Sequence, residues 1–314
     1  MDNSLFVRYC GNPILTADDW PYSCNTVFNP AAVRLKDGRT LLLCRVEDHR
    51  GMSHLCAARS TDGLTNWIID LTPTMQPDIE NHPEEIWGVE DSRITFVPEL
   101  DRYAVAYTSF SGSGPGVSLA LTDDFRSFER FGTVMPPEDK DAALLPRRIG
   151  DYRAMIHRPV GSIGAGGAHI WISYSPDLRH WGSHKMILEA RKGAWWDADR
   201  IGLSPPLIET SEGWLMLYHG VRSTVAGKVY RVGLALFDLE QPERCLRRGD
   251  PWLFASETDY ERGGDVENVV FPCGTTVADD GDTLHMYYGA ADTCVPSPHS
   301  DLKTSRVARR IRPR

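Results

Sequence analysis

The stretch WGVEDSRIT, residues 87–95, places two adjacent carboxylates ahead of an apolar run. Side chains of a β-strand alternate between its two faces, so Glu90 and Asp91 are expected to point to opposite sides. A carboxyl group that faces a binding site can act as a general acid, whereas one that faces water only begins a solvated strand. The motif alone leaves both interpretations open.

Cationic side chains stand at comparable places elsewhere in the chain. Lys140 and Arg200 each precede an apolar strand, and Arg158 and His219 each follow one. Cations that converge from several strands would hold an oxyanion or a phosphate, and arginine suits bidentate contacts to both. An inverting glycosidase needs a second carboxylate to activate water. Phosphate is already anionic and needs positive charge instead, so one acid beside a basic cluster favours phosphorolysis over hydrolysis.

Five predicted hairpins would bring these residues together. Each consists of an apolar strand, a turn rich in Asp and Gly, and a second apolar strand, as in residues 31–47 and 92–110. A further strand with a polar turn and an aromatic residue follows most of them, as in CAARSTDGLTNW. About four strands per repeat is the pattern of a propeller blade. The expected fold is all-β, a single five-bladed β-propeller over residues 1–295, with a β-sandwich as the alternative.

In a propeller, ligands bind where the inner strands and their loops meet at the central channel. Polar or charged residues occur at both ends of each predicted hairpin, although the strands between them are apolar. Those upstream of the first strands are Asn29, Asp91, Lys140 with Asp141, Arg200 and Asn268. Those at the ends of the second strands are Arg45, Thr108, His157 with Arg158, His219 and Asp292. A binding site explains this concentration, whereas a purely structural role does not.

Composition restricts the partners. The 314 residues carry a formal net charge of −9, which argues against a nucleic-acid or anionic membrane surface, and no apolar stretch reaches the length of a membrane span. Seven scattered cysteines without CxxC spacing and the absence of a signal-peptide pattern predict a cytoplasmic protein with reduced thiols. The histidines show no zinc-ligand spacing, so neither a metal nor a cofactor is expected.

Residues 296–314 are expected to form a separate basic C-terminal tail. The segment SRVARRIRPR is typical of a solvated, disordered tail rather than a binding arm. Two prolines in CVPSPHSD also argue against a strand there, because proline removes a hydrogen-bond donor from the ladder. Closure of the last blade is therefore expected to be altered.

Several segments together resemble glycoside hydrolase family 130, the β-mannoside phosphorylases. They are NTVFNPAAV, RVEDHRG, WGVEDSRIT, DKDAALLPRR, IHRP, RIGLSPPLIET, YHGV, GDVENVVFPCG and YYGAADT. The resemblance extends from GNPIL near the N-terminus to Thr293. It implies a five-bladed propeller that cleaves β-1,2- or β-1,4-linked mannosides with inorganic phosphate, inverts the anomeric centre, and releases α-mannose 1-phosphate and a shortened acceptor.

The resemblance also implies roles for individual residues. Asp91 would be the sole catalytic acid, protonating the glycosidic oxygen through the 3-hydroxyl of the mannosyl unit. The implied phosphate ligands are Arg158, Arg200, His219, Lys140 and Tyr230. The implied mannosyl ligands are Asn29, Arg45 and Asp292. Phosphate would be a co-substrate, and no cofactor is implied.

Three other functions remain open on the same propeller: a β-mannosidase that uses water, a mannosyltransferase that works in the synthetic direction, and a sugar-binding protein without turnover. Hydrolases of the family are similar in fold but place acids where this sequence keeps its cations, so the phosphorylase is favoured. The linkage, the acceptor sugar and whether the protein is a homo-oligomer are left open by the sequence.

Overall fold

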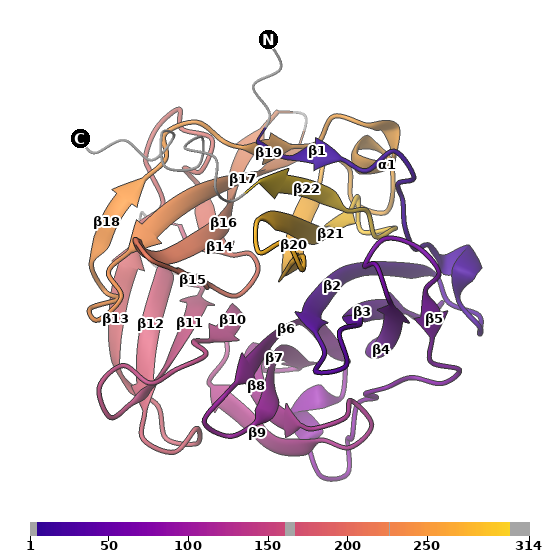
Figure 1. The fold of residues 1–314 in the computed structure, drawn as a ribbon, viewed down its shortest axis with the longest axis horizontal. Helices are drawn as coiled ribbons and strands as arrows, with labels where there is room; N and C mark the ends of the chain where they lie inside the picture. Colours follow the sequence, from indigo (N-terminus) through magenta and orange to yellow (C-terminus); the bar gives the residue numbers. More distant parts are fainter. Residues whose placement is uncertain (1–4, 161–166, 226, 302–314) are drawn as a thin grey trace.

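The structure is a computed structural model that describes residues 5–160, 167–225 and 227–301, and within these ranges five antiparallel sheets form a ring (Figure 1). The innermost strands β2, β6, β10, β14 and β20 surround the centre of the ring (Figure 1). The fold is therefore a five-bladed β-propeller, and the sequence prediction is confirmed.

Blades one to three are built in the same way, each from four consecutive strands in the described chain. Blade one contains β2 (Thr26–Arg34), β3 (Thr40–Glu47), β4 (Ser53–Ser60) and β5 (Ile68–Ile69). Blade two contains β6 (Val89–Val97), β7 (Arg102–Ser111), β8 (Gly114–Thr122) and β9 (Glu129–Met135). Blade three contains β10 (Asp139–Leu144), β11 (Arg153–Pro159), β12 (Ile170–Ser175) and β13 (Gly182–Leu188).

Blade four is longer and carries two extra strands. Its main path is β14 (Arg200–Leu203), β16 (Gly213–Thr224), β17 (Gly227–Phe237) and β18 (Cys245–Arg248). The short strands β15 (Ile208–Thr210) and β19 (Phe254–Ala255) pair with β16 and β17. Helices are short in the described ranges: η1 (Ala17–Asp19), η2 (Pro83–Glu85) and α1 (Asp259–Arg262). Among the described residues, no helix is long and apolar enough to cross a membrane.

Blade five combines the two ends of the chain. Its strands β20 (Val270–Val277), β21 (Thr283–Ala290) and β22 (Pro298–Asp301) are followed by β1 (Val7–Arg8) from the N-terminal side. The expectation that prolines prevent a strand here was wrong: Pro298 is the first residue of β22, a position that tolerates proline. Strand β22 lies beyond the predicted domain boundary at residue 295. The rest of the predicted tail, residues 302–314, lies outside the described residues.

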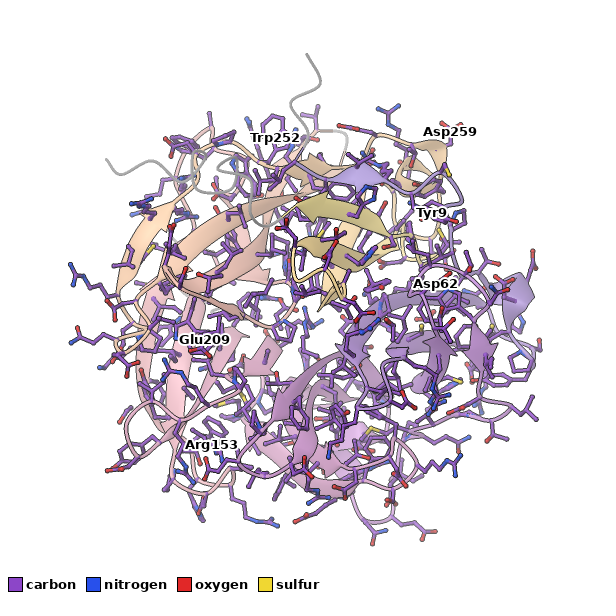
Figure 2. All side chains as sticks on the ribbon, in the orientation of Figure 1. Tyr9, Asp62, Arg153, Glu209, Trp252 and Asp259 are labelled. Atoms are coloured by element: carbon purple, nitrogen blue, oxygen red, sulfur yellow. The ribbon has the colours of Figure 1, made fainter. Side chains whose placement is uncertain are left out.

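The hydrophobic core lies between the blades. Among the described residues, five large clusters of buried apolar side chains each join two neighbouring blades, and Figure 2 shows side chains filling these spaces. A strand in the middle of a blade is thus covered on both faces, which explains continuous apolar runs such as LLLC in β3. This packing leaves the polar strand ends as the places where side chains of several blades can meet.

Candidate active site

A β-bulge near the start of the inner strand recurs in the first three blades. The pairing register of β2, β6 and β10 shifts around Asn29, Asp91 and Asp141, respectively. These three residues have positive φ angles of 45°, 45° and 55°. Asn and Asp occupy this left-handed region more readily than other side chains, and a bulge re-aims the residue that it contains. The three polar side chains are therefore turned out of the strand pattern at equivalent places of consecutive blades.

Asp91 is buried between groups of blades one and two. Its Oδ1 accepts a hydrogen bond of 2.8 Å from Asn29 Nδ2 and lies 3.3 Å from a guanidinium nitrogen of Arg45. Burial by itself would raise the pKa of the Asp91 carboxyl. The positive charges of Arg45, Lys140 and Arg93 outweigh that effect and hold the pKa below its usual value. Asp91 is therefore ionised in the unliganded protein.

Arg45 collects three carboxylates around its guanidinium group. It lies 3.2 Å from both Glu47 and Glu90 and 3.3 Å from Asp91. The prediction that Glu90 and Asp91 point to opposite sides was therefore wrong, because the bulge at Asp91 interrupts the alternation of the strand. The ring of Phe28 lies 4.7 Å from the guanidinium carbon and packs against it. Arg45 is fixed from several sides and can present its remaining donor capacity to a ligand.

Asp292 follows β21, and its carboxyl group is close enough to Asp91 for the two charges to interact. Burial and the negative charge of Asp91 raise the pKa of Asp292 to about 7, although Arg45 and Lys140 act in the opposite direction. The two carboxyl groups thus differ: Asp91 is an anion, and Asp292 retains a proton up to nearly neutral pH. This division of charge is typical of functional sites.

A second group of charges surrounds Asp141 on blade three. Its Oδ2 accepts a hydrogen bond of 2.8 Å from Arg158 Nε, and its Oδ1 lies 3.5 Å from Arg93. Burial would raise the pKa of Asp141, but Arg158 and Arg93 hold it well below its usual range. A side chain at Gly202 would place its Cβ only 2.4 Å from Asp141 Oδ2, so glycine leaves room for this cluster on β14. Asp141 orients Arg158 instead of serving as a free base.

His219 lies against this cluster as a neutral imidazole. Its Nε2 is 3.6 Å from Asp141 Oδ2, but burial, together with the nearby arginines, lowers the pKa of His219 to about 3. The sequence analysis counted His219 among the cations, which the structure corrects. Among the described residues, no hydrogen-bond partner contacts its buried Nδ1. That nitrogen is free to bind a ligand.

Two predicted phosphate ligands carry charge that no acid in the described chain neutralises. Arg200 donates a 2.8 Å hydrogen bond to the hydroxyl of Tyr230 on β17. Among the described residues, it forms no ion pair with a carboxylate. Lys140 likewise forms no ion pair there, although its charge lowers the pKa of Asp91 and Asp141. The ring of Tyr230 lies 6.1 Å from that of His219. The structure thus links Arg200, Tyr230 and His219 through neighbouring contacts, and it links Arg158 to them through Asp141.

Arg93 is the main residue of the site that the sequence analysis missed. It is buried, and it donates hydrogen bonds to the backbone oxygens of Ser204 and Leu203 on blade four and of Asp91 on its own strand. Its guanidinium carbon also lies 5.4 Å from the ring of Phe271 on blade five. Arg93 therefore joins three blades beneath the site. The available signal was an arginine embedded in the apolar run SRITFV.

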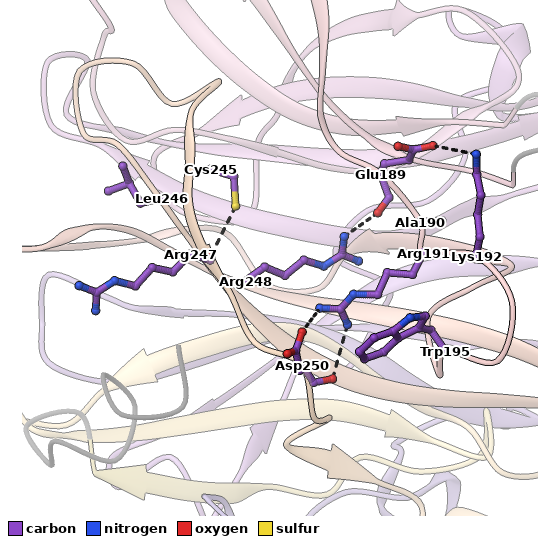
Figure 3. A pocket seen from close by; sticks show the side chains of 10 residues that line it. All are labelled: Glu189, Ala190, Arg191, Lys192, Trp195, Cys245, Leu246, Arg247, Arg248 and Asp250. Atoms are coloured by element: carbon purple, nitrogen blue, oxygen red, sulfur yellow. Dashed lines mark hydrogen bonds and ion pairs between the residues drawn. The ribbon is translucent and has the colours of Figure 1, made fainter. Parts of the chain in front are cut away.

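The segment before Arg200 is held in place by side chains that line a cleft outside the channel. This cleft has a volume of about 620 Å³. It lies beside β18, with Trp195 at one side (Figure 3). Arg248 bonds at 2.6 Å both to the backbone oxygen of Glu189 and to buried Asp197. Trp196 is buried and stacks on Tyr218, whereas Trp195 is 38% exposed. The ion pairs of the cleft fix the backbone just before Arg200.

Comparison with known proteins agrees with this geometry. A protein-family model described as β-1,4-mannooligosaccharide phosphorylase matches residues 8–301. The chain belongs to glycoside hydrolase family 130. Within family 130, it is 35% identical over 293 residues to the β-1,4-mannooligosaccharide phosphorylase of Ruminococcus albus, covering 92% of this chain and 86% of the relative. The resemblance found in the sequence is confirmed.

Solved structures of family 130 share the fold. The β-1,2-mannobiose phosphorylase of Listeria innocua, in complex with β-1,2-mannobiose, matches with a TM-score of 0.86 at 29% identity, covering 99% of both chains. A structure from work on family 130 glycoside hydrolases that target β-1,2-mannosidic linkages in Candida mannan has a TM-score of 0.82 at 26% identity, covering 96% of this chain and 95% of that one. The family thus includes phosphorylases and hydrolases on one propeller.

Metal chemistry finds no support among the described side chains. No group of three or more His, Cys, Asp or Glu residues within 5–160, 167–225 and 227–301 is arranged to hold a metal ion. The polar groups gathered at the strand ends are instead the ionised acids Asp91 and Asp141, the carboxyl group of Asp292, several arginines, a lysine and a neutral histidine. Such a set suits an anion and a polyhydroxylated ligand.

Proposed function

We propose that this protein cleaves β-linked mannosides by phosphorolysis and releases α-mannose 1-phosphate and a shortened acceptor. The observation that carries the proposal is a pair of cations without an ion-pair partner in the described chain: Lys140, whose charge lowers the pKa of the buried acid Asp91, and Arg200, which bonds to Tyr230 beside His219. Positive charge of this kind suits a phosphate nucleophile. Membership of family 130 and the phosphorylases among its relatives support the same reaction.

Phosphate would bind to the cations and to the neutral donors beside them. Arg158, Arg200 and Lys140 supply positive charge, while Tyr230 and His219 supply hydrogen bonds without charge. The fixed orientation of Arg158 by Asp141, at 2.8 Å, reduces the entropy lost when phosphate binds. Because the nucleophile is already an anion, the reaction needs no base.

The mannosyl unit would lie between the phosphate and Asp91, held by Asn29, Arg45 and Asp292. A phosphate oxygen forms a bond to the anomeric carbon on the face opposite the glycosidic oxygen, and the carbon–oxygen bond to the acceptor breaks. A proton passes to the departing oxygen from Asp91 by way of the mannosyl 3-hydroxyl. The β-linkage is thereby converted into an α-phosphate.

This role requires Asp91 to be protonated when the reaction occurs. In the unliganded protein, the charges of Arg45, Lys140 and Arg93 keep the pKa of Asp91 low despite its burial. A bound phosphate dianion offsets part of this positive charge and so raises the pKa of the acid. Binding of the nucleophile would therefore favour the protonated form of Asp91.

Hydrolysis by the same site would need a second carboxylate that activates water. Asp141 is buried and bonded to Arg158, and Asp292 holds a proton up to a pH of about 7. Asp141 is therefore not a free base, and Asp292 would be the base of the β-mannosidase alternative. The cations Lys140 and Arg200, which a water nucleophile does not need, favour phosphorolysis instead.

The test is incubation of the protein with β-1,2-mannobiose or β-1,4-mannobiose, with and without inorganic phosphate. We expect mannose 1-phosphate to form only when phosphate is present, and the disaccharide that reacts identifies the linkage. Release of free mannose at the same rate without phosphate would contradict the proposal and identify a hydrolase. Incubation with mannose 1-phosphate and mannose tests the synthetic direction.

A further inference from the structure

A chain of four hydrogen-bonded side chains crosses blade three from β10 to β13. Asp139 Oδ2 lies 2.6 Å from His157 Nδ1, and His157 Nε2 lies 2.7 Å from Ser173 Oγ. The same Ser173 Oγ lies 2.6 Å from His184 Nδ1. Asp139, His157 and Ser173 are buried, whereas His184 is exposed on the outer strand. The chain therefore connects the inner strand of the blade with its outer edge.

These contacts resemble those of a nucleophilic serine, but the burial of Ser173 excludes that role. The order Asp139, His157, Ser173 has the connectivity of an acyl-transfer triad. However, Ser173 is 0% exposed, and its hydroxyl oxygen also contacts His184. No substrate can approach the oxygen, so these four side chains can only act by positioning the residues that they contact.

The inner end of the chain holds Arg158, a predicted phosphate ligand. The backbone N–H of Arg158 donates a 3.1 Å hydrogen bond to Asp139 Oδ1, while Oδ2 of the same carboxylate contacts His157. Arg158 Nε then reaches Asp141 at 2.8 Å. Asp139 thus fixes the backbone of Arg158, and Asp141 fixes its side chain.

The hydrogen-bond inventory orders the protons along the chain. If His157 is a neutral imidazole whose Nδ1–H donates to the Asp139 carboxylate, then Nε2 accepts a hydrogen bond from the Ser173 hydroxyl. Ser173 Oγ is then left to accept from His184 Nδ1–H. In this arrangement Asp139 fixes the tautomer of His157, as outer partners do for the histidine ligands of metal sites, and His157 fixes the direction of the Ser173 hydroxyl hydrogen.

A second bulge brings His184, the outermost of the four hydrogen-bonded residues, into contact with Ser173. The register between β12 and β13 shifts at the level of Ser173, and Ser183 adopts a positive φ of 51°. Bulges re-aim side chains, and here the following residue, His184, contacts Ser173 across the strands. A bulge on β10 thus orients Asp141, and a bulge on β13 orients His184.

We propose that Asp139, His157, Ser173 and His184 form a positioning chain that fixes the phosphate ligand Arg158. None of the four contacts the substrate in this scheme; they act by holding the backbone and the orientation of Arg158. The inference rests on the proposed function, because it takes Arg158 to be a ligand of phosphate.

The decisive measurement separates the KM for phosphate from the KM for the mannoside. His157→Phe removes the donor to Asp139, and we expect the KM for phosphate to rise about tenfold or more, as for the loss of outer partners at metal sites. The KM for the mannoside should change less than about twofold, since uniform binding of that half is untouched. His157→Asn keeps an N–H donor near the position of Nδ1 and should restore most of the affinity for phosphate.

Ser173→Ala provides a second variant that adds no volume, should His157→Phe fail to fold. We expect its KM for phosphate to rise about threefold to tenfold because the tautomer of His157 is no longer fixed. Ser118→Ala is the matched control: Ser118 is buried on the third strand of blade two and donates a 2.8 Å hydrogen bond to Ser109. That control should leave the KM for phosphate within about twofold of the wild type.

Two results would overturn the inference. One is an unchanged KM for phosphate in folded His157→Phe and Ser173→Ala proteins; the other is an equal rise of both KM values, which indicates general damage. The thermal shift produced by inorganic phosphate provides an independent readout without mannoside. A wild-type protein that turns over without phosphate would instead refute the proposed function, so the two failures are distinguishable.

Discussion

At the scale of single residues, the site depends on backbone conformations that most side chains avoid. Asn29 and Asp91 both have φ angles of 45°, and their side chains meet at 2.8 Å across two blades. Asn and Asp are the side chains best suited to this region, because their short polar groups can bond locally. At both positions, the same side chain thus permits the positive φ angle and supplies the polar group of the site.

Asp91→Asn tests the role of the acid. The variant keeps the shape of the side chain but cannot deliver a proton, so we expect the rate of phosphorolysis to fall about a hundredfold to ten-thousandfold. Far-ultraviolet circular dichroism should remain that of the wild type. Turnover near the wild-type rate would remove Asp91 from the reaction.

Asp292 makes stability depend on pH in a defined direction. Burial and the charge of Asp91 raise its pKa from 3.8 to about 7 in the folded protein, so the folded state binds more protons than the unfolded state between these values. This contribution to stability is present below about pH 4 and is lost as the pH rises to about 7.

Asp292→Asn should therefore be more stable than the wild type at pH 8, by a few degrees in Tm, and similar to it at pH 4. Thermal unfolding of both proteins across this range is the measurement. The same variant should keep a strict requirement for phosphate, because Asp292 is proposed to bind a mannosyl hydroxyl. A wild-type advantage at pH 8 would contradict the assigned pKa direction.

At this scale, the sequence indicated which residues lie near the site better than it indicated their protonation states. The polar ends of the hairpins pointed to Asp91, Arg158 and Arg200 because an isolated charge beside an apolar strand is conspicuous. The neutral form of His219 was not predictable, since it follows from burial and from arginines of other blades. Arg93 was missed because most of its partners are backbone oxygens, which the residue types do not reveal.

At the scale of elements, the segment before β14 owes its position to ion pairs rather than to regular structure. Buried Asp197 accepts hydrogen bonds from Arg248 at 2.6 Å and from the Tyr218 hydroxyl at 3.0 Å. Trp196 donates to the backbone oxygen of Asp250 at 2.8 Å. These contacts hold residues 196 and 197 against blade four and thereby place Arg200.

Arg248→Met should destabilise the protein by about 3 kcal/mol, because it leaves the buried charge of Asp197 incompletely paired. Urea unfolding provides the measurement. Lys185→Met is the control, since the Lys185–Glu243 pair is largely exposed and should contribute less than about 1 kcal/mol. Equal losses of unfolding free energy in the two variants would show that the buried ion pair stabilises the protein no more than the exposed one.

The hairpins could be predicted from the sequence, whereas the closing strand could not. Each hairpin combines two apolar runs with a turn signal, and this local pattern survives in the structure. Strand β1 has only two residues, Val7 and Arg8, and pairs with residues 298 and 299. So short a segment has no periodicity to detect, and its partner lies at the far end of the chain. The bulges escaped prediction for a similar reason, because register is a property of two strands.

At the scale of the whole molecule, one arginine ties the N-terminal strand to residues 254–261, far along the chain. Arg8 bonds to buried Glu261 at 2.9 Å, to Glu257 at 2.8 Å and to the backbone oxygen of Ala255 at 2.6 Å. Its guanidinium carbon lies 4.4 Å from the ring of Phe254. These contacts connect β1 to the segment between blades four and five.

Arg8→Met should lower stability by about 3 kcal/mol, because Glu261 would remain buried with too few partners. Hydrogen exchange should show the loss most strongly in β22, which pairs with β1, and then in β21 on the other side of β22. Lys36→Met, which removes an exposed ion pair with Asp101, is the matched control. Exchange that rises equally in all five blades would contradict a local role in closure.

The pairing of β1 with β22 also has a consequence for biosynthesis. Blades one to four can each form as their residues leave the ribosome, but residues 7–8 have no strand partner until residues 298–301 follow. At roughly 5–20 residues per second, this interval lasts about 15–60 s. Throughout it, Val7 and Arg8 lack the strand with which they pair in the folded ring. Ring closure is thus the final folding event, and a prematurely terminated chain cannot complete it.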